Sequence, residues 1–187
     1  MVDYRQRKQL IAEAVESVRA TLKLLASRGI QCDIVTGAGT GSYPFETESG
    51  VYTELQCGSY IFMDAHYQTL HDRHGQPVST FSNALYVLTS IVSSASPGRA
   101  ICDAGLKAHS IDSGMPVIAG EETLKYIKAT DEHGVISDPH NRLKLNDRIY
   151  LVPGHCDPTC NLYDWYVGVR GGKVETLWPV SARGKLY

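Results

Sequence analysis

The beginning of the sequence carries a helical period that is not sustained later in the chain. Over residues 4–28 apolar side chains recur at steps of three and four, which predicts an amphipathic helix, and Gly29 is placed to cap its C-terminus. Residues 31–36 predict a short strand that leads into the glycine-rich loop 37–41. Helix, strand and glycine loop in this order are typical of an α/β unit.

The rest of the sequence predicts mainly β structure. Residues 51–64 resemble a strand that is interrupted at 57–59, and the polar stretch 68–77 predicts a linker or an exposed loop. Further strands are expected where apolar, β-prone runs lie between turn residues, at 85–94, 99–104, 148–153 and, as a hairpin turning at Gly171 and Gly172, at 163–170 and 174–180. We therefore expect an α/β fragment followed by a mainly β domain, with the boundary near 68–77.

The length of the chain limits how much of a barrel it can hold. A complete (β/α)8 barrel takes roughly 250 residues and often no fewer than about 200. A chain of 187 residues therefore cannot contain such a barrel and a second domain as well.

Charge and hydropathy exclude several classes of partner. Eighteen Lys and Arg against twenty Asp and Glu leave a net charge of −2, so no basic field attracts nucleic acid or an anionic membrane. No apolar run approaches the roughly 18 residues of a membrane span, and the N-terminus opens a charged helix, which predicts a cytoplasmic protein. Five cysteines, an odd number, fit reduced thiols better than a disulfide framework.

The densest cluster of candidate metal ligands follows the predicted strand 148–153. In extended backbone, residues i and i+2 point the same way, so His155 and Asp157 can present an imidazole and a carboxylate to one ion while leaving positions open for water or substrate. Two alternatives stay open. The two side chains can simply hydrogen-bond within a loop, or Cys156 and Cys160 can belong to a structural zinc site, although the paired Cys-x-x-Cys knuckles of such sites are missing.

The glycine loop 37–41 is a candidate anion site. Its successive backbone N–H groups can converge on an anion, Thr40 can add a hydroxyl donor, and the loop ends a predicted strand, where α/β folds bind phosphates. No Lys follows as in a Walker loop, and the dinucleotide fingerprint is incomplete. A plain turn is an equally good interpretation of the residues alone.

Four separated motifs, taken in order, resemble the D-threonine aldolase and D-serine dehydratase family over nearly the whole chain. They lie at residues 36–41, 49–64, 103–107 and 153–162. The resemblance implies that residues 1–67 form the last units of an alanine-racemase-like (β/α)8 barrel that binds pyridoxal phosphate. Residues 78–187 would then form a metal-binding, D-serine-dehydratase-like β domain.

The resemblance also implies the site residues. His155 and Asp157 fall on the ligands of a divalent metal, Mn or Zn, and Asp157 favours the aldolase members, because dehydratase members tend to have Cys at that position. The resemblance also places six residues around pyridoxal 5′-phosphate. Its phosphate would be held by Gly39, Thr40, Gly58, Ser59 and Tyr60, and Gln56 would lie near its ring.

The implied activity is that of a lyase on D-3-hydroxy amino acids. We expect retro-aldol cleavage to glycine and an aldehyde, as in D-threonine aldolase; water elimination with release of ammonia, as in D-serine dehydratase, is the alternative. The family's Schiff-base lysine lies upstream of the region that this chain resembles, and none of this chain's lysines stands in that motif. The catalytic residue is therefore unknown, and the alternative of another class is a noncatalytic remnant or metal-binding module. Expected partners are the D-amino acid, the remaining barrel half and, as is common in the family, a second subunit in a homodimer.

Overall fold

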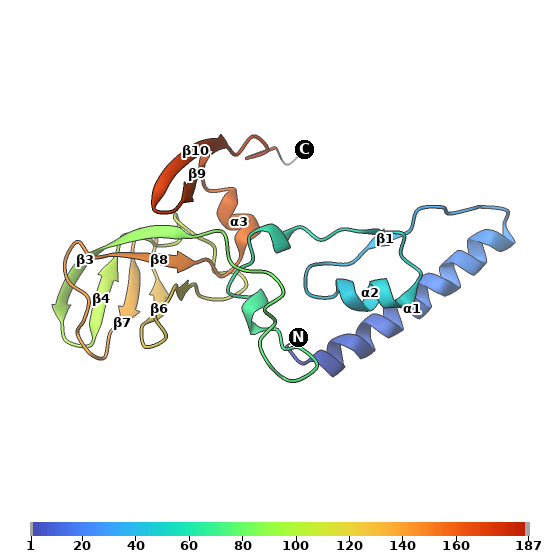
Figure 1. Ribbon diagram of the computed structural model, residues 1–187, viewed down its shortest axis with the longest axis horizontal. Coiled ribbons are helices and arrows are strands. Elements are labelled where there is room, and N and C mark those ends of the chain that lie inside the picture. The colour runs from blue at the N-terminus through green and yellow to red at the C-terminus, as the bar shows by residue number, and fades with distance from the viewer. Residues whose placement is uncertain (1, 186–187) are drawn as a thin grey trace. The chain divides into compact units, whose positions relative to one another are not determined.

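The computed structural model describes residues 2–185, and the chain divides into two compact units (Figure 1). The first comprises the residues up to Met63 together with Tyr67–Ser82. The second comprises Asp64–His66 and the residues from Asn83 onward. The polar stretch 68–77 thus lies inside the first unit and not at a boundary.

Helix α1 (Tyr4–Ser27) confirms the helix predicted from periodicity. The side chain of Asp3 accepts a hydrogen bond from the backbone N–H of Gln6 at 2.8 Å, which caps the N-terminus. At the other end Gly29 has a φ of +73°, the left-handed conformation that terminates helices. Helix α2 (Tyr43–Ser49) packs against α1, and the rings of Tyr4 and Phe45 meet edge to face with centroids 5.1 Å apart.

Two short parallel strands form the β part of the first unit. Strand β1 (Thr36–Gly37) pairs with β2 (Glu54–Leu55), and α2 lies between them in the chain, which makes a small β-α-β unit. The expected strands 31–36 and 51–64 are therefore much shorter than predicted, because only these residues find ladder partners within the described part of the chain. A 3-10 helix, η1 (Ser59–Ile61), begins at the last residue of the interruption expected at 57–59.

The polar segment 68–77 is connected to α1 by a hydrogen bond from Arg7. The Arg7 guanidinium donates to the carbonyl oxygens of Val2 at 2.5 Å and His71 at 2.8 Å. A second 3-10 helix, η2 (Tyr67–Thr69), and a bridge between His71 and Pro77 order this polar stretch. Hydrogen bonds to backbone carbonyls thus fix a segment whose composition alone suggested a linker.

The second unit is built on a six-stranded antiparallel sheet in the order β5-β8-β3-β4-β7-β6 (Figure 1). Each neighbouring pair is antiparallel. The strands β3, β4 and β8 confirm the predicted strands, whereas β5, β6 and β7 were not expected. The bounds are β3 (Val87–Ser96), β4 (Arg99–Cys102), β5 (Val117–Ile118), β6 (Lys125–Ala129), β7 (Gly134–Ser137) and β8 (Arg148–Val152).

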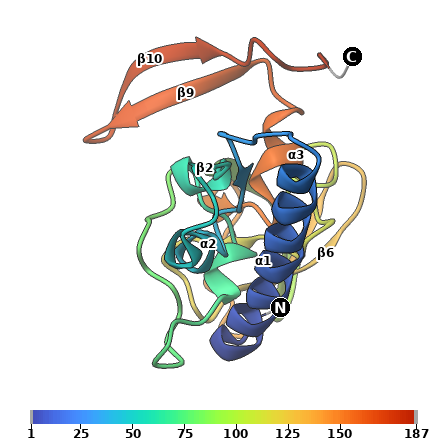
Figure 2. The ribbon, with the colours of Figure 1, turned by 90° about the vertical axis from the view of Figure 1, so that its right-hand side faces the viewer.

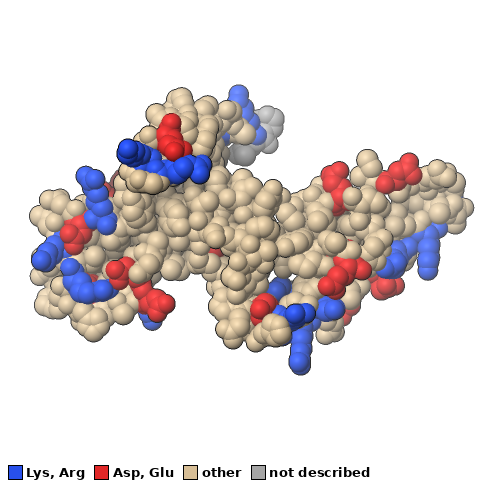
Figure 3. Space-filling view, viewed as in Figure 1, with Lys and Arg blue, Asp and Glu red and all other residues tan. Residues whose placement is uncertain are grey.

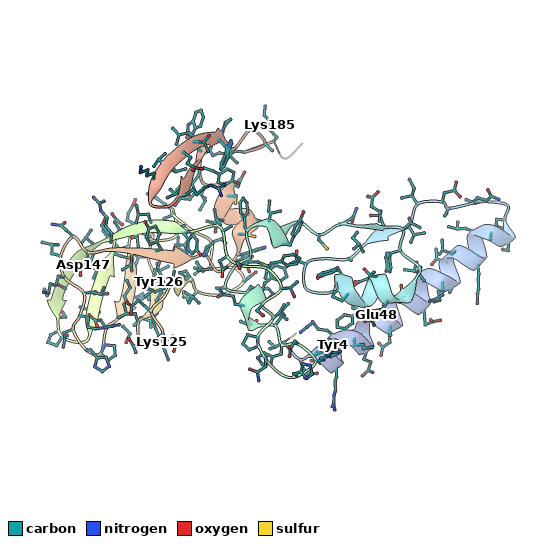
Figure 4. All side chains as sticks on the ribbon, in the orientation of Figure 1. Tyr4, Glu48, Lys125, Tyr126, Asp147 and Lys185 are labelled. Carbon is teal, nitrogen blue, oxygen red and sulfur yellow. The ribbon has the colours of Figure 1, made fainter. Side chains whose placement is uncertain are left out.

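The core of the second unit lies on one face of this sheet. Ile91, Ile136 and Leu151 come from different strands and are fully buried in one apolar cluster. Side-chain direction alternates along a regular β-strand. Lys125 and Tyr126, neighbours on β6 and labelled in Figure 4, are accordingly exposed and buried.

A separate hairpin follows. Strands β9 (Trp165–Arg170) and β10 (Lys173–Pro179) pair only with each other in the described sheets and lie apart from the six-stranded sheet (Figure 2). Gly171 and Gly172 have φ values of +56° and +75°, which confirms the predicted glycine turn. The hairpin exposes many apolar side chains: Trp165, Val167, Val169, Val174, Leu177 and Trp178.

The surface carries both signs of charge. On the face shown in Figure 3, Lys and Arg are interspersed with Asp and Glu on each unit, which agrees with the near-zero net charge. Among residues 2–185, no helix has both the length and the apolar character that crossing a bilayer requires.

Candidate metal centre and phosphate cradle

His155 and Asp157 lie at the junction between β8 and a short helix, α3 (Cys156–Cys160). His155 is the N-cap and has extended backbone, with φ −146° and ψ 122°, but Asp157 belongs to the first turn of the helix. Extended backbone was predicted at both positions, and this prediction is wrong for Asp157. The two side chains nevertheless approach each other, with 3.7 Å between the His155 Nε2 and Asp157 Oδ2 atoms.

The other ring nitrogen of His155 is held by Asp112. Its Nδ1 lies 2.7 Å from Asp112 Oδ2, and the hydroxyl of Ser113 lies 3.3 Å from the same nitrogen. The Ser110 hydroxyl donates to Asp112 Oδ1 at 2.5 Å and, with the His155 ring, lowers the pKa of the Asp112 carboxyl to about 2. Asp112 is therefore an ionised acceptor at neutral pH, so Nδ1 of His155 carries the proton that it shares with this carboxylate.

This arrangement suits a divalent cation. With Nδ1 acting as donor, the lone pair of Nε2 is free on the side of the ring where the Asp157 carboxylate lies. The Asp157 side chain is exposed and the His155 side chain is 28% exposed, so further coordination positions are open to solvent. Within residues 2–185 no cluster of three or more His, Cys, Asp or Glu residues is placed around one ion, so the candidate is an open, two-ligand site.

The two cysteines of α3 are engaged in other contacts. The Cys156 thiol is buried and donates to Asp157 Oδ1 at 3.2 Å. Burial raises the pKa of the Cys160 thiol, which also bonds the hydroxyl of Tyr166. A structural zinc site at these cysteines would lack a third and a fourth ligand in the described part of the chain.

A buried carboxylate outside the predicted set supports the start of α3. Asp64 is fully buried, and its Oδ2 accepts a hydrogen bond from the backbone N–H of Cys156 at 2.9 Å. Neither Asp64 nor Asp112 was singled out from the sequence. Both act through partners that are far away in the chain, and no local spacing pattern marks such contacts.

In the first unit the two predicted phosphate loops lie at the same sheet edge. They follow the carboxyl ends of the parallel strands β1 and β2, and the backbone N–H of Gln56 donates to the Gly37 carbonyl oxygen at 2.8 Å. The first loop supplies Gly39 and Thr40. The second supplies Gln56, Gly58, Ser59 and Tyr60. The carboxyl ends of parallel strands are where α/β folds hold phosphates.

The surroundings of Thr40 bear on whether these two loops can hold a phosphate. Its side chain is 8% exposed, yet no partner within residues 2–185 bonds its buried hydroxyl oxygen. Ala38 has a φ of +71°, and a Cβ on Gly39 would meet nothing within 4 Å, so there is open space beside Gly39. The backbone N–H of Gly39 itself donates to the Ser42 hydroxyl at 3.3 Å. Ser59 is buried, whereas Gln56 and Tyr60 are exposed. An unpartnered hydroxyl at such a turn fits an anionic group such as a phosphate.

The chain is similar to known proteins over its whole length. Residues 84–169 match the family described as "Putative serine dehydratase domain". The whole chain is 54% identical, over 189 aligned positions, to a 3-hydroxy-D-aspartate aldolase of Paracoccus denitrificans (strain Pd 1222), of which it covers 49%.

Two solved structures share the fold. The crystal structure of D-threonine aldolase from Filomicrobium marinum matches the whole chain with a TM-score of 0.93 and 41% identity, and 50% of that protein is covered. An alanine racemase-like protein of Idiomarina loihiensis matches 81% of the chain and 44% of its own length with a TM-score of 0.67; at 20% identity it shows the fold alone.

The chain thus spans about half the length of the relatives that it matches. The likenesses confirm the predicted fold class, an alanine-racemase-like α/β fragment followed by a D-serine-dehydratase-like β domain. The resemblance to the D-threonine aldolase and D-serine dehydratase family is therefore confirmed, and the chain is similar over its whole length to the C-terminal half of those proteins.

Proposed function

We propose that this chain supplies the metal site and part of the cofactor site of a lyase that cleaves D-3-hydroxy amino acids to glycine and an aldehyde. The observation that carries the proposal is the His155–Asp157 pair, in which one ring nitrogen is engaged by Asp112 and the other faces the second carboxylate. The names of the relatives, 3-hydroxy-D-aspartate aldolase and D-threonine aldolase, point to the same substrate class.

The two sites have complementary tasks. When bound, pyridoxal phosphate would stabilise the electron pair left on Cα, and a divalent ion such as Mn²⁺ or Zn²⁺ would polarise the β-hydroxyl of the substrate. His155 and Asp157 would hold the ion. In the first unit, Thr40 would donate its hydroxyl to the phosphate, and the turn at Gly58 and Ser59 would add backbone donors.

Asp157 favours the aldolase over the dehydratase reaction. A carboxylate is a hard ligand that suits Mn²⁺, whereas a thiolate at the same position would select softer ions such as Zn²⁺. The neighbouring Cys156 thiol is buried and donates a hydrogen bond to Asp157. Because dehydratase members of the family tend to have Cys at this position, and because the similar proteins named above are aldolases, we place D-threonine and 3-hydroxy-D-aspartate ahead of D-serine as substrates.

The metal site can be tested on this chain alone. Titration with Mn²⁺ and with Zn²⁺ in a calorimeter should show one site, and His155→Ala should weaken it by at least tenfold. His74→Ala, which changes an exposed loop histidine in the other unit, is the matched control and should bind as the wild type does. Equal affinity of wild type and His155→Ala would show that the ligands are assigned incorrectly.

The reaction needs the other half of the enzyme as well. We would co-express this chain with the N-terminal half of the Paracoccus relative, purify the complex with pyridoxal phosphate and Mn²⁺, and supply D-threonine, 3-hydroxy-D-aspartate and D-serine. Release of glycine supports the aldolase proposal. Release of ammonia and a 2-oxo acid contradicts it in favour of the dehydratase alternative, and a metal-loaded complex without either product favours a noncatalytic metal-binding module.

A further inference from the structure

The loop 110–114 contacts His155 on the side of the ring that faces away from Asp157. Asp112 lies against Nδ1 at 2.7 Å, while Nε2 lies 3.7 Å from Asp157. Two serines, Ser110 and Ser113, each donate a hydroxyl to the Asp112 carboxylate, at 2.5 and 3.2 Å. Each oxygen of Asp112 thus has a donor within its own loop, and one of them also meets the histidine.

The loop 110–114 is connected to α3 by a hydrogen bond to the buried residue Thr159. Thr159, which is 1% exposed, donates its hydroxyl to the His155 carbonyl oxygen at 2.7 Å and accepts from the backbone N–H of Ser110 at 3.1 Å. Gly154 lies so close that a Cβ there would stand 1.9 Å from the Gly114 carbonyl oxygen. The position of Asp112 relative to the His155 ring is therefore set by the packing of two backbone segments and not by the exposed side chain alone.

The contact with Asp112 affects both the tautomer and the orientation of the His155 imidazole. A neutral histidine has two tautomers, and only the one protonated on Nδ1 leaves Nε2 free to bind a cation. A carboxylate accepts and cannot donate, so its contact with Nδ1 selects this tautomer and also fixes the plane of the ring.

We propose that Asp112 is a positioning residue of the metal site: held by Ser110 and Ser113, it fixes the His155 ring in the tautomer and orientation that turn Nε2 toward the ion. This inference rests on the proposed function, because His155 is its ligand. Carboxylate partners of this kind change metal affinity by about 10–100-fold when they are removed.

The tautomer gives a readout that does not need metal or activity. In metal-free protein near pH 8, long-range ¹H–¹⁵N spectra should show His155 protonated on Nδ1 in the wild type. In Asp112→Ala the Nε2–H form should become populated, and in Asp112→Asn, which keeps an oxygen but no charge, the shift should be partial. A wild-type spectrum of the Nε2–H form, or spectra that do not change in either variant, would overturn the proposal.

Metal affinity gives the second readout. Asp112→Ala should bind Mn²⁺ about 10–100-fold more weakly than the wild type. Asp103→Asn is the matched control, because Asp103 is also an exposed carboxylate of the second unit that accepts from a hydroxyl, that of Thr89 at 2.6 Å, and it should bind normally. Circular dichroism should show all variants folded, and Asp112→Asn replaces Asp112→Ala if the latter does not fold.

The outcomes separate the two proposals. If His155→Ala loses Mn²⁺ affinity and Asp112→Ala does not, the metal site stands and the role of Asp112 is wrong. If the wild type and His155→Ala bind alike, the metal site itself is wrong, while the tautomer spectra still decide whether Asp112 orients the ring.

Discussion

The carboxylate of Asp64 accepts a hydrogen bond from the backbone N–H of Cys156 at 2.9 Å, across 92 positions of the chain. Both residues are buried, so removal of the acceptor takes away a buried hydrogen bond at the start of α3. We expect Asp64→Ala to lower the free energy of unfolding by about 1–3 kcal/mol. Urea denaturation followed by circular dichroism measures this difference.

Asp64→Asn is the control for that prediction. An amide oxygen can still accept from Cys156, so this variant should retain more stability than Asp64→Ala does. Equal losses in the two variants would mean that the hydrogen bond to Cys156 is not what stabilises this junction.

The apolar core of the second unit predicts a sharp contrast between two positions. Ile136 in β7 is 0% exposed and belongs to the core cluster, whereas Val169 in β9 is 60% exposed. Ile136→Ala should cost about 2–5 kcal/mol of unfolding free energy, through lost apolar contact and the cavity left behind. Val169→Ala should change stability by no more than about 0.5 kcal/mol, and a larger loss there would show that the hairpin face is covered in solution.

Asp138 predicts how stability depends on pH. Burial by itself raises the pKa of this carboxyl, but hydrogen bonds from backbone N–H groups, including that of Leu143 at 2.8 Å, lower the pKa by more than burial raises it. The pKa therefore lies below the ordinary value of 3.8. Because the folded pKa is depressed, the carboxylate stabilises the fold above pH 3.8, and this contribution is lost as the pH falls through the lower folded pKa.

The measurement compares wild type with Asp138→Asn in urea from neutral pH to about pH 2.5. The variant should be less stable at neutral pH, and the difference should shrink as the pH falls below 3.8. A difference that stays constant over this range would show that the charge of Asp138 does not contribute.

The close packing of Gly154 predicts a coupling between the backbone and the metal site. A Cβ at this position would lie 1.9 Å from the Gly114 carbonyl oxygen, so Gly154→Ala must change how residue 154 and the loop 110–114 pack together, and we expect the loop to move. Asp112 then moves away from the His155 ring, and we expect weaker Mn²⁺ binding together with a lower melting temperature. Gly39→Ala is the control, since its added methyl group meets nothing within 4 Å, and it should bind Mn²⁺ normally. Unchanged Mn²⁺ affinity in Gly154→Ala would contradict this coupling.

Several elements were predictable because neighbouring residues determine them. The apolar period of α1, the left-handed Gly29 after it and the Gly171–Gly172 turn are local features, and the structure confirms all three. Helix α2 was missed because seven residues are too few for a period, although Pro44 stands at its start. Strands β5, β6 and β7 have two to five residues each and exist through pairing with distant strands.

The sequence by itself determined which side chains can do chemistry, since His155 and Asp157 stand two positions apart and Thr40 lies in a glycine loop. Only the tertiary structure decided how they are used. Asp112 reaches His155 across 43 positions, and the hydroxyl of Thr40 is buried without a partner in the described chain. Such contacts depend on which segments pack together, and packing is set by the whole sheet and core and not by the spacing of residues within one segment.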